Sequence, residues 1–123
     1  MSTFGVVVGT RSEEGRDEFL RYHSAAIEIP SPTITRLEKV SKETGVFLVV
    51  GVIERELGTL YCTVVFIDPT EGYVGKHRKL MPTAAERLIW GFGDASTLPV
   101  LERSFSRKEG ESTTCKLSAT ICW

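Results

Sequence analysis

Two apolar runs separated by a short turn constrain the fold of this chain more than any other feature. Residues 47–53 read FLVVGVI, residues 60–67 read LYCTVVFI, and residues 56–58 (ELG) lie between them. Runs of this length, rich in β-branched residues and broken by glycine, predict two strands joined as a hairpin. The first run does not alternate apolar and polar residues, so we expect it to be covered on both faces.

The clearest helix in the sequence comes before this hairpin. Residues 30–32 (PSP) break the preceding segment, and Ser31 is a candidate N-cap. Ile34, Leu37 and Val40 recur at three-residue spacing, and Gly45 has the position of a helix stop. The pattern therefore predicts one amphipathic helix directly before the hairpin.

The remaining segments carry weaker signals. Ser12 before two glutamates indicates a helix start, although Gly15 early in the segment opposes it. Residues 78–99 have no clean periodicity and are rich in Pro, Gly and Trp, which is typical of a functional loop. The other expectations are an extended segment or buried strand at 3–9, a helix end or extended chain at 22–29, a turn at 68–72, extended chain at 73–77 and a short strand at 117–122.

Composition excludes several classes of protein. A chain of 123 residues suits one domain, and 15 Lys and Arg against 16 Asp and Glu provide no basic excess for a nucleic-acid backbone. No apolar run approaches the roughly 20 residues of a membrane span, and no signal peptide is visible, so we expect a cytoplasmic location. Three cysteines without CxxC spacing favour neither a disulfide framework nor a zinc site.

Three features of the second half could carry chemistry. Residues 76–79 (KHRK) are either a solvated positive edge or, because LMPT follows, the site of a partly desolvated Lys79 that stabilises charge. By itself Glu86 is more simply half of a surface ion pair than an acid–base group. Cys122 is either a buried inert thiol or a nucleophile whose pKa a nearby lysine lowers.

Together these features resemble a known family. Residues 75–100, GKHRKLMPTAAERLIWGFGDASTLPV, resemble the nitrilase branch of the carbon–nitrogen hydrolase superfamily, and plant nitrilases in particular. The resemblance extends through residues 2–32 and 48–75 and resumes at 119–123 (ATICW). It implies an α/β fold, a partial α-β-β-α sandwich formed by the N-terminal portion of the family domain without its first strand and its second half. Residues 1–123 are then one partial domain.

The resemblance also implies three site residues. It places the catalytic lysine of the HRKL-x-PT motif at Lys79, the cysteine nucleophile at Cys122 and a second glutamate at Glu86. The implied chemistry is addition of the Cys122 thiolate to a nitrile carbon to give a thioimidate, with Lys79 stabilising the developing negative charge. Water then releases a carboxylic acid and ammonia. No metal and no organic cofactor is implied.

Two departures from the family leave open whether this chain acts as an enzyme by itself. The family's general base is a glutamate upstream of the STFG segment, and the chain begins at Met1. Residues 101–118 are longer, more charged and richer in Ser and Thr than the family's short hairpin, so we expect an atypical, flexible segment there. The resemblance implies a small nitrile as substrate, either cyanoalanine-like or an arylacetonitrile, and a homo-oligomer. The alternatives are a non-catalytic fragment that associates with full-length nitrilase subunits, through an uncovered sheet face or residues 90–93, and an amidase.

Overall fold

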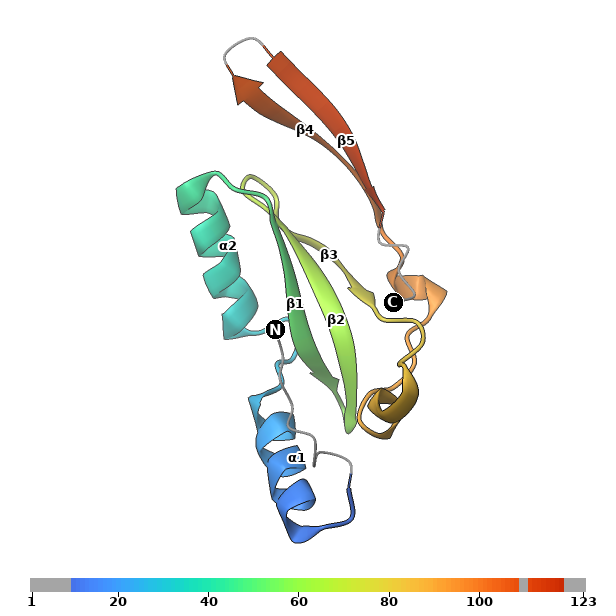
Figure 1. The fold of residues 1–123 in the computed structure, drawn as a ribbon. Helices are drawn as coiled ribbons and strands as arrows, with labels where there is room; N and C mark the ends of the chain where they lie inside the picture. Colours follow the sequence, from blue (N-terminus) through green and yellow to red (C-terminus); the bar gives the residue numbers. More distant parts are fainter. Residues whose placement is uncertain (1–9, 109–110, 119–123) are drawn as a thin grey trace.

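An antiparallel sheet lies at the centre of the computed structural model, which describes residues 10–108 and 111–118. Helices α1 (Glu13–Ala25) and α2 (Pro32–Thr44) come first. Strands β1 (Leu48–Glu56), β2 (Thr59–Asp68) and β3 (Gly72–Arg78) follow and form the sheet in the order β1-β2-β3 (Figure 1). Strands β4 (Val100–Lys108) and β5 (Glu111–Ser118) pair with each other as a second sheet.

The predicted hairpin is confirmed, and its register is continuous. Val50 of β1 lies opposite Val65 of β2, and the pairing runs from the open end to the turn at residues 57–58. The predicted turn at 68–72 is also present, because the Asp68 carboxylate accepts hydrogen bonds from the backbone N–H groups of Thr70 and Glu71 at 2.8 and 3.0 Å. This turn reverses the chain into β3, which was expected as extended chain.

Helix α2 covers one face of the sheet (Figure 1). Ile34 of the helix packs against Val65 and Ile67, and all three are buried. The opposite face of β1 is open, since Val49 is 54% exposed and Gly51 is exposed as well. The prediction that both faces of this strand are covered is therefore wrong at Val49 and Gly51, although Ile53, on the same face nearer the turn, packs against a buried cluster.

Local sequence accounts for the ends of both helices. The Ser12 hydroxyl accepts a hydrogen bond from the N–H of Gly15 at 3.1 Å, so the serine caps α1 and the early glycine is tolerated inside it. The predicted second helix is confirmed as α2, with Ser31 at its N-cap position and Pro32 in its first turn. Gly45 ends α2 in the left-handed region at φ 68°, which glycine adopts without steric cost.

A second cluster joins α1 to the turn end of the sheet. The buried residues Ala26, Leu60, Ile89 and Trp90 form it, and Phe19 and Tyr22 of α1 pack against them. After α1 the chain runs extended beside β1, where Ile27 bridges Glu54. Segment 22–29 therefore combines the two expectations for it, a helix end and then an extended stretch.

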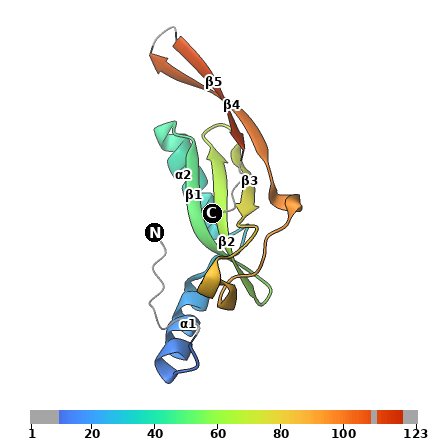
Figure 2. The same ribbon diagram turned by 45° about the vertical axis from the view of Figure 1, so that its right-hand side comes forward.

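Two long strands occupy the segment that was expected to be atypical. Strand β4 pairs with β5 from Val100 opposite Ser118 to Lys108 opposite Glu111, and in Figures 1 and 2 this hairpin extends away from the first sheet. The expected strand at residues 3–9 and residues 119–122 of the expected last strand lie outside the described residues. Within the described ranges, neither helix has the length and apolar character that crossing a membrane requires.

Candidate active site

The cationic run at residues 76–79 is not a solvated edge. His77 and Lys79 are buried, and the side chains of Lys76 and Arg78 are only 19% and 12% exposed. Because side chains alternate along a strand, Lys76 and Arg78 face the α2 side of the sheet, while His77 and Lys79 point to the other side. The Nδ1 of His77 lies 2.7 Å from the carbonyl oxygen of Thr97, an acceptor, so this nitrogen carries the proton.

Lys79 and Glu86 form a partly buried ion pair. The Lys79 Nζ donates to Glu86 Oε2 at 2.6 Å, and the two side chains are 7% and 27% exposed. The expected desolvation of Lys79 is therefore confirmed. Glu86 is indeed half of an ion pair, as its sequence context suggested, but it lies beside a buried ammonium rather than on an open surface. A desolvated, paired lysine of this kind can stabilise a negative charge that develops next to it.

The turn that carries Glu86 is built to hold its carboxylate. Thr83 and Glu86 make a capping box at the start of the 3-10 helix Ala84–Leu88, and Glu86 Oε2 accepts the Thr83 N–H at 2.6 Å. Burial raises the pKa of Glu86, but the Lys79 ammonium and the Thr83 N–H outweigh it and lower the pKa below its ordinary value. Glu86 is therefore an ionised partner of Lys79 at neutral pH.

Backbone hydrogen bonds fix the loop around Lys79. The Lys79 N–H donates to the Cys62 carbonyl of β2 at 2.8 Å, and the Lys79 carbonyl accepts the Gly93 N–H at 3.0 Å. A Cβ at Gly93 would lie 2.6 Å from the Arg78 carbonyl oxygen, so only glycine fits this close approach. The same loop contains the short 3-10 helices Ala84–Leu88 and Ala95–Thr97. The expectation of an irregular segment at 78–99 is therefore confirmed.

An aromatic side chain closes one side of the pair. The Lys79 Nζ lies 5.8 Å from the centre of the Trp90 ring, within the range of a cation–π contact. The Trp90 indole N–H donates to the Tyr22 hydroxyl of α1 at 3.0 Å, and the Gly91 N–H donates to the Leu60 carbonyl at 2.8 Å. Helix α1 and strand β2 therefore hold Trp90 against the lysine.

One cysteine lies near the pair, and it is not the predicted one. Cys62 of β2 is half-buried, and burial raises the pKa of its thiol; the Lys79 ammonium lowers that pKa by less, and the Glu86 carboxylate raises it further. This thiol is therefore a poor nucleophile at neutral pH. Cys122, the predicted nucleophile, lies outside the described residues.

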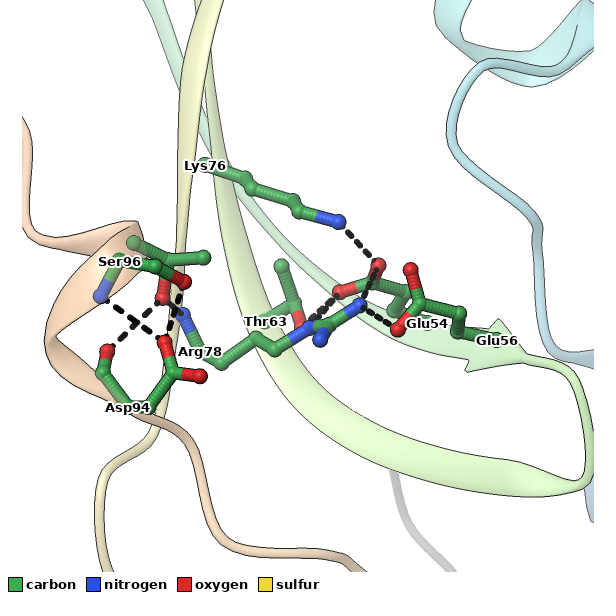
Figure 3. A network of polar contacts seen from close by, with 8 residues as sticks. Glu54, Glu56, Thr63, Lys76, Arg78, Asp94 and Ser96 are labelled. Atoms are coloured by element: carbon green, nitrogen blue, oxygen red, sulfur yellow. Dashed lines mark hydrogen bonds and ion pairs between the residues drawn. The ribbon is translucent and has the colours of Figure 1, made fainter.

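A buried carboxylate on the other face of the sheet was missed by the sequence reasoning. Glu54 of β1 is 1% exposed and accepts hydrogen bonds from Thr63 and Arg78, each at 2.9 Å, and from Lys76 (Figure 3). Its pKa falls to about 2, because these hydrogen bonds outweigh the effect of burial. An acidic residue directly after the apolar run 47–53 was the available signal.

No metal site is visible in this region. Among residues 10–108 and 111–118, no group of three or more His, Cys, Asp or Glu side chains could hold a metal ion. The polar groups gathered at the described part of the site are one ammonium, one carboxylate and backbone amides. Such a set suits electrostatic stabilisation of a reacting anion.

Comparisons with known proteins give one consistent result. A family model described as carbon–nitrogen hydrolase matches residues 2–123. An arylacetonitrilase of Trametes versicolor is 69% identical over 100% of this chain and 39% of its own length. A bifunctional nitrilase/nitrile hydratase of Lupinus angustifolius is 51% identical over 99% of the chain and 32% of its own, and nitrilase 1 of Arabidopsis thaliana is 51% identical over 98% and 32%.

A solved structure supports the fold. The crystal structure of an N-terminal amidase with an Asn-Glu-Ala peptide matches at a TM-score of 0.60 and 18% identity, over 84% of this chain and 26% of that one. At this identity the likeness concerns the fold alone, and it confirms the expected mixed α/β class with a partial fold of the nitrilase type. The chain spans between 32% and 39% of the length of the curated relatives named above.

Proposed function

We propose that this chain, which belongs to the carbon–nitrogen hydrolase family, carries the lysine, the second glutamate and the cysteine of a nitrilase. The reaction is hydrolysis of an organic nitrile to a carboxylic acid and ammonia. The observation that supports it most is the Lys79–Glu86 pair, whose 2.6 Å contact joins the two site residues of segment 75–100. The chain spans only part of the length of its relatives, so nitrile hydrolysis by the whole protein is part of this proposal.

Each residue has one role in the proposed reaction. The Cys122 thiolate adds to the nitrile carbon, and a π electron pair of the C≡N bond moves to nitrogen, which is protonated to give a thioimidate. Lys79 stabilises the negative charge on that nitrogen, and Glu86 holds the lysine ammonium in place. One water then adds and ammonia leaves, and a second water releases the acid from the thioester. We assign no residue of this chain as the general base.

Arylacetonitriles are the first substrates to test. The 69% identical relative is named an arylacetonitrilase, so this class takes precedence over cyanoalanine-like nitriles. Two plant relatives are named bifunctional nitrilase/nitrile hydratases. The same tetrahedral intermediate that loses ammonia can lose the thiolate instead and yield an amide, so the assay should quantify amide as well as acid.

The test is release of ammonia from a nitrile panel by the purified chain. We expect turnover of arylacetonitriles that is lost in Cys122→Ala and retained in Cys115→Ala, which removes another thiol of the same C-terminal region. Lys79→Met should lose turnover as well. Lys39→Met is its matched control, because Lys39 is an exposed lysine of α2 in a 3.7 Å pair with Glu43. Wild-type turnover no higher than that of Cys122→Ala would reject an enzymatic role for the chain alone.

Association with full-length nitrilase subunits is the second candidate, and one observation favours it. The open face of β1 exposes Val49, an apolar side chain near the start of the strand. Under this proposal the chain is a cytoplasmic, non-catalytic partner. Size-exclusion chromatography with a full-length nitrilase should show co-elution that Val49→Lys abolishes and Val40→Lys, on an exposed position of α2, does not. Separate elution of the wild-type chain would reject the association.

We also propose that residues 1–123 act as one partial domain in which 101–118 is the atypical segment. Arg103 of β4 forms ion pairs with Asp68 at the end of β2 at 2.8 Å and with Glu71 of the following turn at 3.3 Å. Limited trypsin digestion should cut first between Arg103 and Lys116. Protection of that segment, with earlier cuts elsewhere, would count against its flexibility.

A further inference from the structure

One carboxylate ties the three strands of the first sheet together. Glu54 lies on β1, Thr63 on β2, and Lys76 and Arg78 on β3 (Figure 3). Glu54 Oε2 accepts from Thr63 Oγ1 and from Arg78 Nε, each at 2.9 Å. Glu54 Oε1 accepts from Arg78 Nη2 at 2.5 Å and from the Lys76 ammonium. The donors therefore occupy about four acceptor positions, the full capacity of a carboxylate.

The arrangement depends on charge as well as on hydrogen bonds. Lys76 and Arg78 bring two positive charges to a carboxylate that is 1% exposed. Of these two cations, only Arg78 has a second acidic partner within residues 10–108 and 111–118, the half-exposed Glu56 at 3.0 Å. The guanidinium also lies 3.9 Å from the centre of the Tyr61 ring. Among the described residues, Glu54 is thus the one acidic contact of Lys76. Its two oxygens also accept from two nitrogens of Arg78, which fixes the plane of the guanidinium group.

Strand alternation connects this cluster to the proposed active site. Arg78 is the last residue of β3, and Lys79 follows it, so clamping the side chain of one residue on the α2 face orients the next toward the opposite face. The Arg78 N–H also donates to Thr97 Oγ1 at 3.2 Å. Arg78 is therefore held by both its side chain and its backbone N–H, directly before the residue whose ammonium contacts Glu86.

We propose that Glu54 is a positioning residue for Lys79: by holding Arg78 and Lys76 it sets where β3 ends and where the Lys79 ammonium lies relative to Glu86. The inference rests on the proposed function of Lys79, and it adds a residue that touches neither substrate nor nucleophile. The alternative is that Glu54 only stabilises the sheet. The two differ in one measurable respect, since only positioning requires the Lys79–Glu86 contact to change in a folded variant.

The ionisation of Glu86 reports on that contact. The Lys79 ammonium contributes to the low pKa of Glu86, so a displaced ammonium raises the pKa of this carboxyl toward its ordinary value. Side-chain carboxyl ¹³C resonances, assigned by their loss in Glu86→Gln, give the titration midpoint directly. In Glu54→Gln we expect the midpoint to rise by about one pH unit, the effect of weakening one charge-assisted hydrogen bond. A change in global stability alone leaves the midpoint of the folded chain unchanged.

Glu56→Gln is the matched control. It removes a carboxylate from the same strand and from the same guanidinium, but it leaves the Glu54 hydrogen bonds in place. Its Glu86 midpoint should equal that of the wild-type chain. An equal rise in both variants would show that the shift does not depend on the Glu54 hydrogen bonds, and it would overturn the proposal.

A second variant decides the question if Glu54→Gln does not fold. Thr63→Val is nearly isosteric and removes one donor from Glu54 Oε2, the oxygen that also holds Arg78 Nε. We expect a smaller rise of the Glu86 midpoint in the same direction. An unchanged midpoint in the variant that folds overturns the positioning role. The measurement needs no turnover, so an inactive chain with a shifted midpoint rejects the proposed function and retains the positioning of Lys79.

Discussion

Acidification should weaken this fold through the buried carboxylate of Glu54, which is 1% exposed. Burial raises the pKa of this group, but hydrogen bonds from Arg78, Lys76 and Thr63 outweigh burial and lower the pKa from 4.5 to about 2. A carboxyl whose pKa is lower in the folded than in the unfolded chain stabilises the fold at high pH. That stabilisation is complete above about pH 4.5 and is lost as the pH falls toward about 2.

The size of the effect follows from the two pKa values. The difference between 4.5 and about 2 is roughly 2.5 pH units, and each unit corresponds to about 1.4 kcal/mol, so Glu54 contributes about 3 kcal/mol at neutral pH. About 2 kcal/mol of this is lost by about pH 3, where the unfolded carboxyl is protonated and the folded one is still largely ionised. Arg78 keeps its charge throughout this range, because its hydrogen bonds with Glu54 raise the pKa of its guanidinium.

Urea unfolding followed by tryptophan fluorescence tests this prediction. The free energy of unfolding of the wild-type chain should fall between pH 7 and pH 3 by about 2 kcal/mol more than that of Glu54→Gln, which has no carboxyl to titrate. Glu54→Gln should also be less stable at pH 7 by about 3 kcal/mol, because the partly buried Lys76 loses its acidic partner and Arg78 keeps only the half-exposed Glu56. Glu56→Gln, which changes a 55% exposed side chain, should retain the wild-type pH dependence. Equal pH dependence in the wild-type chain and Glu54→Gln would refute the reasoning.

Three further substitutions test local features by the shift of the urea midpoint. Gly93→Ala should cost about 1–3 kcal/mol, because its Cβ would lie 2.6 and 2.8 Å from two backbone carbonyl oxygens, whereas Gly58→Ala, with open space around it, should be nearly neutral. Ser41→Ala should cost about 1–2 kcal/mol, since the fully buried hydroxyl donates to a backbone carbonyl at 2.6 Å. Thr44→Ala, on the exposed side of α2, should cost less than half as much. An equal cost in the two variants would contradict the role of burial. Asp68→Ala should cost about 1–3 kcal/mol by leaving two turn amides without an acceptor, and an unchanged midpoint would show that the turn forms without it.

Local patterns were sufficient for the elements of the first sheet. Helix α2 follows from residues that act over a few positions, a proline in the first turn and a glycine at the left-handed end. The β1–β2 hairpin follows from two apolar runs and the short turn between them. Each of these signals lies within about twenty residues, so no information about distant parts of the chain is needed.

Exposure of a strand is a different kind of property. Val49 and Gly51 lie in an apolar run, yet they are exposed, because α2 covers the other face of β1. The pairing of β4 with β5 could not be predicted either, because this segment is rich in Ser, Thr and charged residues and has no apolar pattern that indicates strands. Whether a face is covered depends on what packs there, which a pattern within one strand does not record.

The sequence by itself determined the family, the order of the helices and the first three strands, and the positions 79, 86 and 122 as the site residues to propose. Only the tertiary structure decided that Lys79 is buried against Glu86 and that Glu54 gathers Thr63, Lys76 and Arg78. The physical reason is register. Thr63 lies opposite Arg78 because of how β2 and β3 pair, and a shift of one residue would turn each of these side chains to the other face. Charged residues that the sequence alone would place on the surface are therefore buried only when the strands pair in this register.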